Sequence, residues 1–229
     1  MSAAAIWAIV PVKALARAKR RLSPTLPPPA RQRLVLAMLE DVLAQLVASG
    51  AVDRILVVSP DARVAALAAA KGALVLSEDR PRGLNRAVKS GLAHAGAQGA
   101  ERALVLPADV PFATSAEIAS VVGAAAGGRR VALVPAADGD GTNAMLLAPL
   151  DAIEPSFGPG SFARHLARAV ARRFDTQVLP LPGLGRDIDE PDDLARLLSS
   201  QQLSRRYHFL SPPPAGRLLA GPRAQRTQP

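Results

Sequence analysis

The sequence predicts an α/β fold in which helices cover both faces of a mostly parallel sheet, forming a three-layer sandwich. Three observations predict it. Short apolar segments of strand length alternate with longer segments whose apolar residues recur at helical spacing. Residues 104–106 are apolar at every position, as expected of a strand buried on both faces. The chain has 229 residues, 49% of them hydrophobic, which suits one large domain of this class.

The elements are expected in the following order. A strand at 6–10 ends at Pro11, and a long loop leads to a helix at 30–49, which Gly50 ends. Further strands are expected at 54–59, 73–77, 104–106, 130–135, 144–148 and 178–181, and further helices at 60–70, 85–97, 115–126, 162–173 and from Pro191. Asn85 or a near neighbour caps its helix. Because strand–helix–strand connections are right-handed crossovers, this alternation predicts a largely parallel sheet.

The charge is concentrated in two places. The net charge is +9, but residues 201–229 hold five Arg and no acid, and the other 200 residues hold 23 Lys and Arg against 19 Asp and Glu. Within those 200, residues 13–33 are basic without a single acid. A local basic loop suits a small polyanion, whereas a nucleic-acid-binding face spreads further and uses stacking aromatics, which are only 3% here. We expect a domain at 1–200 and a mobile Pro/Arg-rich tail at 201–229.

Cysteine is absent, which excludes disulfides, a cysteine nucleophile and thiolate metal sites, and agrees with a reducing cytoplasm. The apolar amino terminus is too short for a secretory signal, and no apolar run reaches membrane-spanning length. We therefore expect a cytoplasmic protein without a membrane partner.

Three acidic residues are the candidate metal ligands. Asp109 follows the strand that Pro107 ends, at the sheet edge where α/β proteins bind ligands, and a carboxylate there can hold a divalent cation. Asp187 and Asp189 are two apart in an extended segment, so they project to the same side and can share one cation. The alternative for Asp109 is that it only turns the chain or caps the next helix.

The basic loop at 12–29 contains no glycine, which disfavours both a dinucleotide-binding turn and a Walker loop. Side chains would then hold phosphates, with Lys13, Lys19 and Arg21 as the candidates. The alternative is a solvated charge run.

A Gly-x-Gly-Ser turn at 158–161 opens the helix expected at 162–173. Backbone N–H groups and a hydroxyl at a helix start are suited to a phosphate or carboxylate. Alternatively, Ser161 is simply the N-cap of an ordinary helix.

Seven short segments, in order, resemble the phospholactate guanylyltransferases of coenzyme F-420 biosynthesis over residues 6–198: 10–13, 18–23, 83–85, 106–111, 141–144, 157–162 with His165, and 187–189. Arg20 and the proline-rich stretch 24–29 depart from that pattern. The resemblance implies a nucleotide-diphospho-sugar transferase-like (Rossmann-like) fold. It also implies magnesium-dependent transfer of GMP from GTP to a phosphorylated three-carbon acid, with release of pyrophosphate.

The resemblance also implies residue roles. Asp109, Asp187 and Asp189 would hold magnesium, and Lys13, Lys19 and Arg21 would clamp the triphosphate, these three and Asp109 being the catalytic residues. Gly83 and Asn85 would lie by the guanine or ribose, and the acceptor would meet Thr142, Asn143, Gly158 and Ser161. His165 either reaches the acceptor or is a half-exposed helix residue. The expected partners are GTP and a small phosphorylated carboxylic acid, with no nucleic acid; a homodimer remains open.

Family branches differ in using 2-phospho-L-lactate, phosphoenolpyruvate or 3-phospho-D-glycerate as acceptor. The resemblance places Thr in the phosphoenolpyruvate branch where this chain has Asn143, which argues against that acceptor. We choose 3-phospho-D-glycerate as the expected acceptor, with 2-phospho-L-lactate and phosphoenolpyruvate as the alternatives. A phosphomonoester has a second pKa of about 6, so the acceptor attacks as a dianion and needs no general base. Alternatives are a molybdopterin guanylyl- or cytidylyltransferase, which would have a Gly-rich opening, a basic nucleic-acid-binding protein, and a non-catalytic nucleotide sensor.

Overall fold

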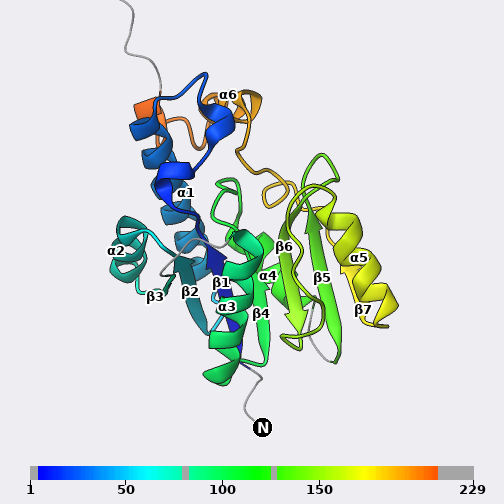
Figure 1. Cartoon of the computed structure of the whole chain (residues 1–229). Coiled ribbons are helices and arrows are strands. Elements are labelled where there is room, and N and C mark those ends of the chain that lie inside the picture. The colour runs from blue at the N-terminus through cyan, green and yellow to red at the C-terminus, as the bar shows by residue number, and fades with distance from the viewer. Residues whose placement is uncertain (1–4, 79–82, 125–127, 211–229) are drawn as a thin grey trace, which may run out of the picture.

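A seven-stranded sheet forms the middle of the molecule (Figure 1). The computed structural model describes residues 5–78, 83–124 and 128–210. The strand order is β3-β2-β1-β4-β6-β5-β7, and only β6 runs antiparallel to its neighbours β4 and β5. The strands are β1 Ile6–Pro11, β2 Arg54–Ser59, β3 Leu74–Ser77, β4 Arg102–Val105, β5 Arg130–Pro135, β6 Thr142–Ala148 and β7 Asp175–Val178. The predicted α/β class with a mostly parallel sheet is confirmed.

Helices cover both faces of the sheet, which gives the three predicted layers. One apolar core joins the sheet to α1 Pro28–Ser49, α2 Ala62–Ala70, α4 Ser115–Gly123 and α6 Pro191–Ser199, and a second joins it to α3 Leu84–Ala97 and α5 Ser161–Ala171. Alternation along β1 supplies both cores, because Ile6 and Val10 face the first and Trp7 and Ile9 the second. Short 3₁₀ helices occur at η1 Leu15–Arg17, η2 Arg20–Leu22 and η3 His208–Leu210.

Helix α3 packs directly on β1, and Gly91 makes this possible. A Cβ at Gly91 would lie 2.6 Å from the Ile9 Cγ2 atom, closer than real Cβ atoms approach. The N-terminus of α3 therefore has a defined place beside the end of β1, and Gly83 is its N-cap.

Most boundaries lie within two residues of the sequence prediction, whereas β7 and α4 differ by three residues and α5 has another N-cap than expected. The strand expected at 178–181 is β7 at Asp175–Val178, where Thr176 and Gln177 pair with Val131 and Ala132 at the sheet edge. An edge strand needs less apolar sequence than a central one, so composition placed it too late. Helix α4 ends at Gly123, and residues 125–126 of its predicted span lie outside the described residues. Helix α5 begins at Ser161 with Gly160 as N-cap, so Ser161 is not the cap.

Residues 201–210, expected to begin a mobile tail, are folded against α1. Tyr207 is fully buried, and its hydroxyl donates a hydrogen bond to Asp41 on α1. Arg206 forms ion pairs with Asp41, at 3.1 Å, and with Glu40. For residues 211–229, which lie outside the described residues, the tail prediction stays a prediction. Within the described part of the chain, no helix has the length and apolarity needed to cross a membrane.

Candidate active site

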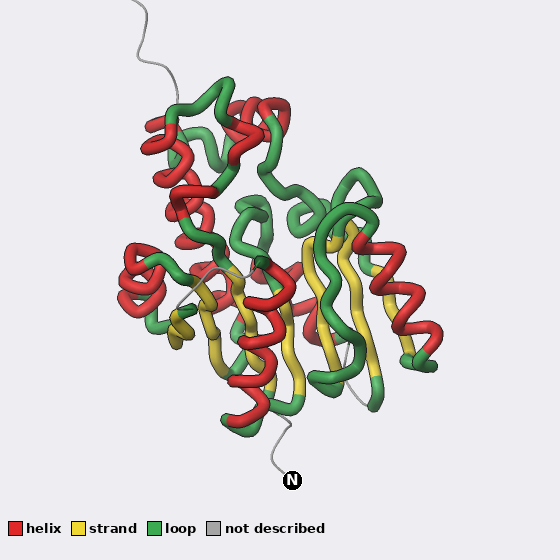
Figure 2. The backbone as a smooth tube through the Cα atoms, in the orientation of Figure 1, coloured by secondary structure: helices red, strands yellow, loops and turns green. Residues whose placement is uncertain are grey.

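Functional side chains gather at one edge of the sheet. The parallel strands β1 and β4 end at this edge, and β6 begins there because it runs the opposite way. Figure 2 shows the loops collected above this edge. The loop after β1 carries Lys13 and Lys19, the loop after β4 carries Asp109, and Thr142 and Asn143 open β6. Segments far apart in sequence therefore contribute to one site.

The three predicted metal ligands come together. One carboxylate oxygen from each of Asp109, Asp187 and Asp189 lies within 4.8 Å of the others, a spacing that could hold a cation. The Ile188 N–H donates to the Asp109 carbonyl at 3.0 Å, and the Ile188 side chain is buried. This contact fixes the two loops against each other. Because side chains alternate in direction along an extended chain, Asp187 and Asp189 point away from the buried Ile188 side chain and toward Asp109.

Lys19 lies inside this group of acids. Its Nζ is 2.7 Å from Asp109 Oδ2 and 2.6 Å from Asp189 Oδ1, and its side chain is only 7% exposed. Burial alone would lower the pKa of Lys19, but the negative charges of Asp109 and Asp189 outweigh it and raise the pKa. Burial likewise opposes ionisation of Asp189, yet the charge of Lys19 brings the Asp189 pKa below its ordinary value. Lys19 and Asp189 are therefore held as a charged pair.

The pKa of Asp187 is shifted in the opposite direction, upward. Burial, followed by the negative charge of Asp109, raises the pKa of Asp187 to about 6. Its partner among the side chains is Asn143, whose Nδ2 donates to Asp187 Oδ1 at 3.2 Å. A cation shared by the three acids would favour the charged carboxylate and relieve this repulsion.

A cleft of about 520 Å³ surrounds these groups. Its described lining combines five basic side chains from one loop with five acidic ones from three other segments: Lys13, Arg17, Lys19, Arg20 and Arg21, and Asp109, Asp138, Asp140, Asp187 and Asp189. Arg21 lies at the rim, 68% exposed and 3.4 Å from Glu190 Oε1. Four of these charged residues were not predicted as site residues: Arg17, Arg20, Asp138 and Asp140. Arg17 and Arg20 could have been found from their place in the same basic loop.

The predicted acceptor residues Thr142, Asn143, Gly158 and Ser161 all line this cleft. Thr142 and Ser161 are nevertheless bonded to each other, since the Thr142 N–H donates to Ser161 Oγ at 3.0 Å. The turn N–H groups expected to receive a ligand are also used internally: Gly160 donates to Asp140 Oδ2 at 2.8 Å, and Ser161 to the Gly158 carbonyl at 3.0 Å. The Gly160 and Ser161 N–H groups are therefore engaged within the protein, and the binding of an acceptor at this turn stays a prediction.

His165 is a buried, neutral part of the scaffold. It is 0% exposed, and the Ser156 N–H donates to its Nε2 at 2.8 Å, so we assign the ring proton to Nδ1, 3.0 Å from Thr142 Oγ1. Burial lowers the pKa of His165 to about 4, and the nearby charges of Arg168 and Arg164 act in the same direction. His165 is thus neither half-exposed nor a group reaching the acceptor; it holds Thr142.

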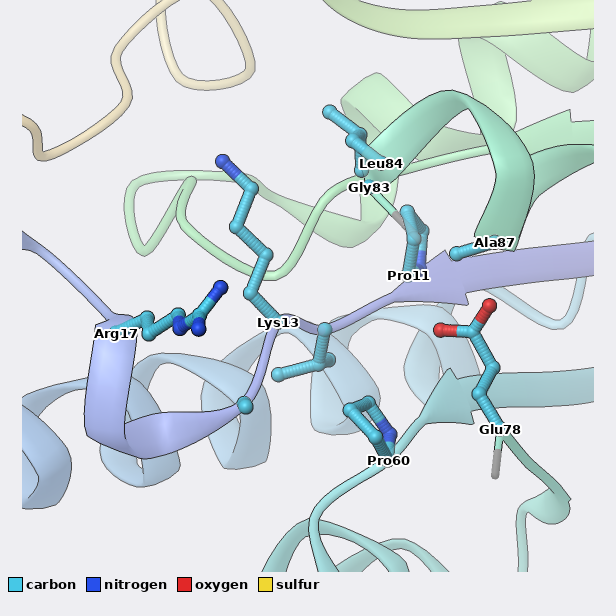
Figure 3. Close-up of a pocket in the computed structure, with 10 residues that line it drawn as sticks. Pro11, Lys13, Arg17, Pro60, Glu78, Gly83, Leu84 and Ala87 are labelled. Carbon is cyan, nitrogen blue, oxygen red and sulfur yellow. The ribbon is translucent and has the colours of Figure 1, made fainter. Parts of the chain in front are cut away.

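Asn85 connects two parts of the site. Its Oδ1 accepts from the Phe157 N–H at 2.6 Å and its Nδ2 donates to the Phe157 carbonyl at 3.0 Å. The amide therefore fixes the loop that carries Gly158, through Phe157, which is 72 residues away from Asn85 in sequence. A direct contact of Asn85 with GTP stays a prediction, whereas Gly83 lines a smaller pocket beside the cleft (Figure 3).

Comparison with known proteins identifies the family. The family model described as "Guanylyl transferase CofC like" matches residues 6–211. This chain belongs to that family. A phosphoenolpyruvate guanylyltransferase of Sphaerobacter thermophilus is 45% identical over 83% of this chain and 91% of the relative. A 2-phospho-L-lactate guanylyltransferase of Methanothermobacter thermautotrophicus is 34% identical over 83% of each chain.

Membership of the guanylyl transferase CofC-like family makes the chain a nucleotidyltransferase. Solved structures support the fold: a nucleotide-diphospho-sugar transferase of Desulfovibrio desulfuricans G20 superposes with a TM-score of 0.67 at 16% identity, covering 90% of this chain and 96% of that chain. The predicted nucleotide-diphospho-sugar transferase-like fold is confirmed.

Proposed function

We propose that this protein transfers GMP from GTP to phosphoenolpyruvate, with release of pyrophosphate, in the cytoplasm and as a step of coenzyme F-420 biosynthesis. The observation that carries the proposal is the meeting of three carboxylates with the basic loop in one cleft. Such a cleft can receive two polyanions and a divalent cation together. Family membership supports the guanylyl group, and the name of the 45% identical relative supports the acceptor.

The acceptor supplies its own nucleophile. Its phosphate oxygen forms a bond to the α-phosphorus of GTP as the bond from that phosphorus to the pyrophosphate oxygen breaks. A phosphate dianion carries the needed electron pair at neutral pH, so no side chain has to remove a proton. The described lining of the cleft accordingly includes no histidine.

The protein's residues align the reactants and balance charge. Asp109, Asp187 and Asp189 would hold magnesium, whose chemistry here is to neutralise charge on the phosphates. Lys13, Lys19 and Arg21 would contact the triphosphate, with Lys19 linking it to the acids. Donors held before the reaction begins can stabilise developing negative charge with little rearrangement.

The acceptor proposed here replaces 3-phospho-D-glycerate for a structural reason. That choice depended on Asn143, but the Asn143 amide donates to Asp187 and so serves the metal side of the cleft. Its identity is then a weak guide to the acceptor, and the relative's name is the stronger support.

The test supplies purified protein with GTP, magnesium and one of the three acids, and counts pyrophosphate. The enzyme that consumes the product is included so that an unfavourable equilibrium does not hide turnover. We expect acid-dependent release with the highest kcat/KM for phosphoenolpyruvate. Higher efficiency with either other acid refutes the acceptor, and no release with any acid refutes the guanylyl transfer.

Asp109→Asn tests the metal assignment in the same assay. Losing a metal ligand costs several kcal/mol of charge stabilisation, so release should fall by about 100-fold or more. Asp151→Asn is the matched control, because Asp151 is exposed and lies outside the described lining of the cleft. An Asp109→Asn rate within a few-fold of that control contradicts the assignment.

A further inference from the structure

A smaller pocket of about 160 Å³ opens beside the main cleft (Figure 3). The two share Pro11, Val12, Lys13, Arg17 and Leu84, so they adjoin at these residues. Lys13 and Arg17 lie at this junction, and both suit a phosphate. A nucleotide with its phosphates in the cleft would direct its base into the smaller pocket.

The smaller pocket suits a flat ring. Its volume is well below the roughly 300–1,000 Å³ of sites for drug-sized ligands, so it cannot take a whole nucleotide. Its walls are mainly apolar, formed by Pro11, Val12, Ala14, Pro60, Leu84 and Ala87. Apolar walls with one or a few polar groups are typical of sites that hold an aromatic ring in a fixed orientation.

Glu78 is the only acid among the described residues that line this pocket. It follows β3, whose last residue Ser77 pairs with Ser59, and its own N–H donates to the Ser59 carbonyl at 3.3 Å. Figure 3 shows its carboxylate turned into the pocket, toward Pro11 and Ala87. The sheet therefore anchors the backbone from which Glu78 reaches the ring position.

The chemistry of a carboxylate selects among bases. Guanine carries two neighbouring donors, N1–H and the N2 amine, on one edge, and an ionised carboxylate is an acceptor with two oxygens. Adenine has an unprotonated N1 and no N2 amine, so its corresponding edge would face the carboxylate with an acceptor and no donor. We propose that Glu78 is the specificity-determining residue that binds the N1–H and N2 amine of guanine and rejects adenine. This inference rests on the proposed function.

The experiment compares GTP, ITP and ATP as donors with one acceptor. ITP keeps the N1–H but lacks the N2 amine, so wild-type kcat/KM should fall from GTP to ITP and further to ATP. Glu78→Gln should lower kcat/KM for GTP by about 10- to 100-fold, the range for losing a hydrogen bond to a charged group, and should narrow the GTP-to-ITP ratio. Glu101→Gln is the matched control, an exposed acid before β4 at the opposite end of the sheet.

The ratio separates recognition from a structural role, because GTP and ITP share their ribose and phosphates. Equal loss for all three donors in Glu78→Gln overturns the inference and leaves the guanylyl transfer intact. If wild type has the same kcat/KM for GTP and for ITP, the inference is overturned without any variant. Should wild type turn over no donor, the proposed function fails, and equilibrium binding of GTP and ITP to wild type and Glu78→Gln then tests the inference by the same ratio.

Discussion

Lys19 Nζ lies 2.7 Å from Asp109 Oδ2, which places a buried ammonium among the acids that could hold a cation. Its backbone is left-handed, with φ 49°, although Lys19 is not glycine. Such a conformation is costly for a residue with a side chain, and it persists where surrounding contacts hold it. The ion pairs with Asp109 and Asp189 are such contacts. Lys19 therefore compensates the acids when no cation is bound.

Lys19→Met should make the protein depend on a divalent cation for stability. The variant loses the compensating ammonium, so the acids repel one another more strongly. We expect a lower Tm than wild type without magnesium, with a cost below the about 3–5 kcal/mol of a fully buried pair, since Asp109 and Asp189 are part-exposed. Magnesium should raise the Tm of the variant more than that of wild type, as thermal denaturation with and without EDTA can measure.

Lys71→Met is the control for Lys19→Met, because Lys71 pairs with Glu40 on a distant part of α1. Its magnesium-dependent change in Tm should equal that of wild type. If magnesium changed the Tm of Lys19→Met by the same amount as that of wild type, Lys19 and the cation would not interact with the same carboxylates.

Asn85→Ala should weaken acceptor use selectively. The variant removes both hydrogen bonds to Phe157 and frees the loop that carries Gly158. Two neutral hydrogen bonds are worth about 1–3 kcal/mol together, so the KM for the acceptor should rise about tenfold while the KM for GTP changes little. Steady-state kinetics with each substrate varied in turn measures both values.

Gln98→Ala, at the exposed C-terminal end of the same helix, should leave both KM values unchanged. A rise in the KM for GTP alone in Asn85→Ala would instead support the direct GTP contact that the family resemblance implied.

The meeting of the three acids could be predicted from sequence because it depends on local rules. Asp109 follows an apolar strand, and strands of a parallel sheet end at one edge. Asp187 and Asp189 share a side because an extended chain alternates. Each of these two inferences uses only a few neighbouring residues. The resemblance to the family then placed the segment of Asp109 and the segment of Asp187 and Asp189 in one site.

Contacts between distant residues could not be predicted in this way. Nothing near Asn85 indicates that its amide is used by Phe157, 72 residues away. Polar composition suggested a mobile segment after residue 200, yet buried Tyr207 and the ion pairs of Arg206 anchor residues 201–210 in a way that composition does not reveal. Likewise, His165 lies on a strongly amphipathic helix, and only the packing shows that its position is buried.

His165 should make folding stability sensitive to mild acid. Its folded pKa of about 4 lies below the ordinary 6.5, so the unfolded chain takes up a proton first as pH falls. Above pH 6.5, His165 is neutral in both the folded and the unfolded state. Between pH 6.5 and pH 4 only the unfolded state takes up the proton, so the free energy of unfolding falls by on the order of 3 kcal/mol in total. Urea unfolding at pH 7 and pH 5 should show the loss in wild type, and less of it in His165→Gln.

His208→Gln provides the comparison, because His208 is exposed and lies outside the described lining of the cleft. Equal loss of stability in wild type and His165→Gln between pH 7 and pH 5 would mean that His165 is protonated in the folded protein too.

Removing residues after 200 should destabilise the domain, because Tyr207 fills part of the core beside α1 and donates to Asp41. Tyr207→Phe loses only the hydrogen bond to a carboxylate and should lower the free energy of unfolding by about 1.5–3 kcal/mol. Tyr207→Ala also leaves a cavity and should cost about 3–5 kcal/mol. A chain ending at residue 210 keeps both contacts and should unfold at the same urea concentration as the full chain, whereas one ending at residue 200 should unfold earlier. Equal midpoints for the chains ending at 200 and 210 would show that the domain is complete without this segment.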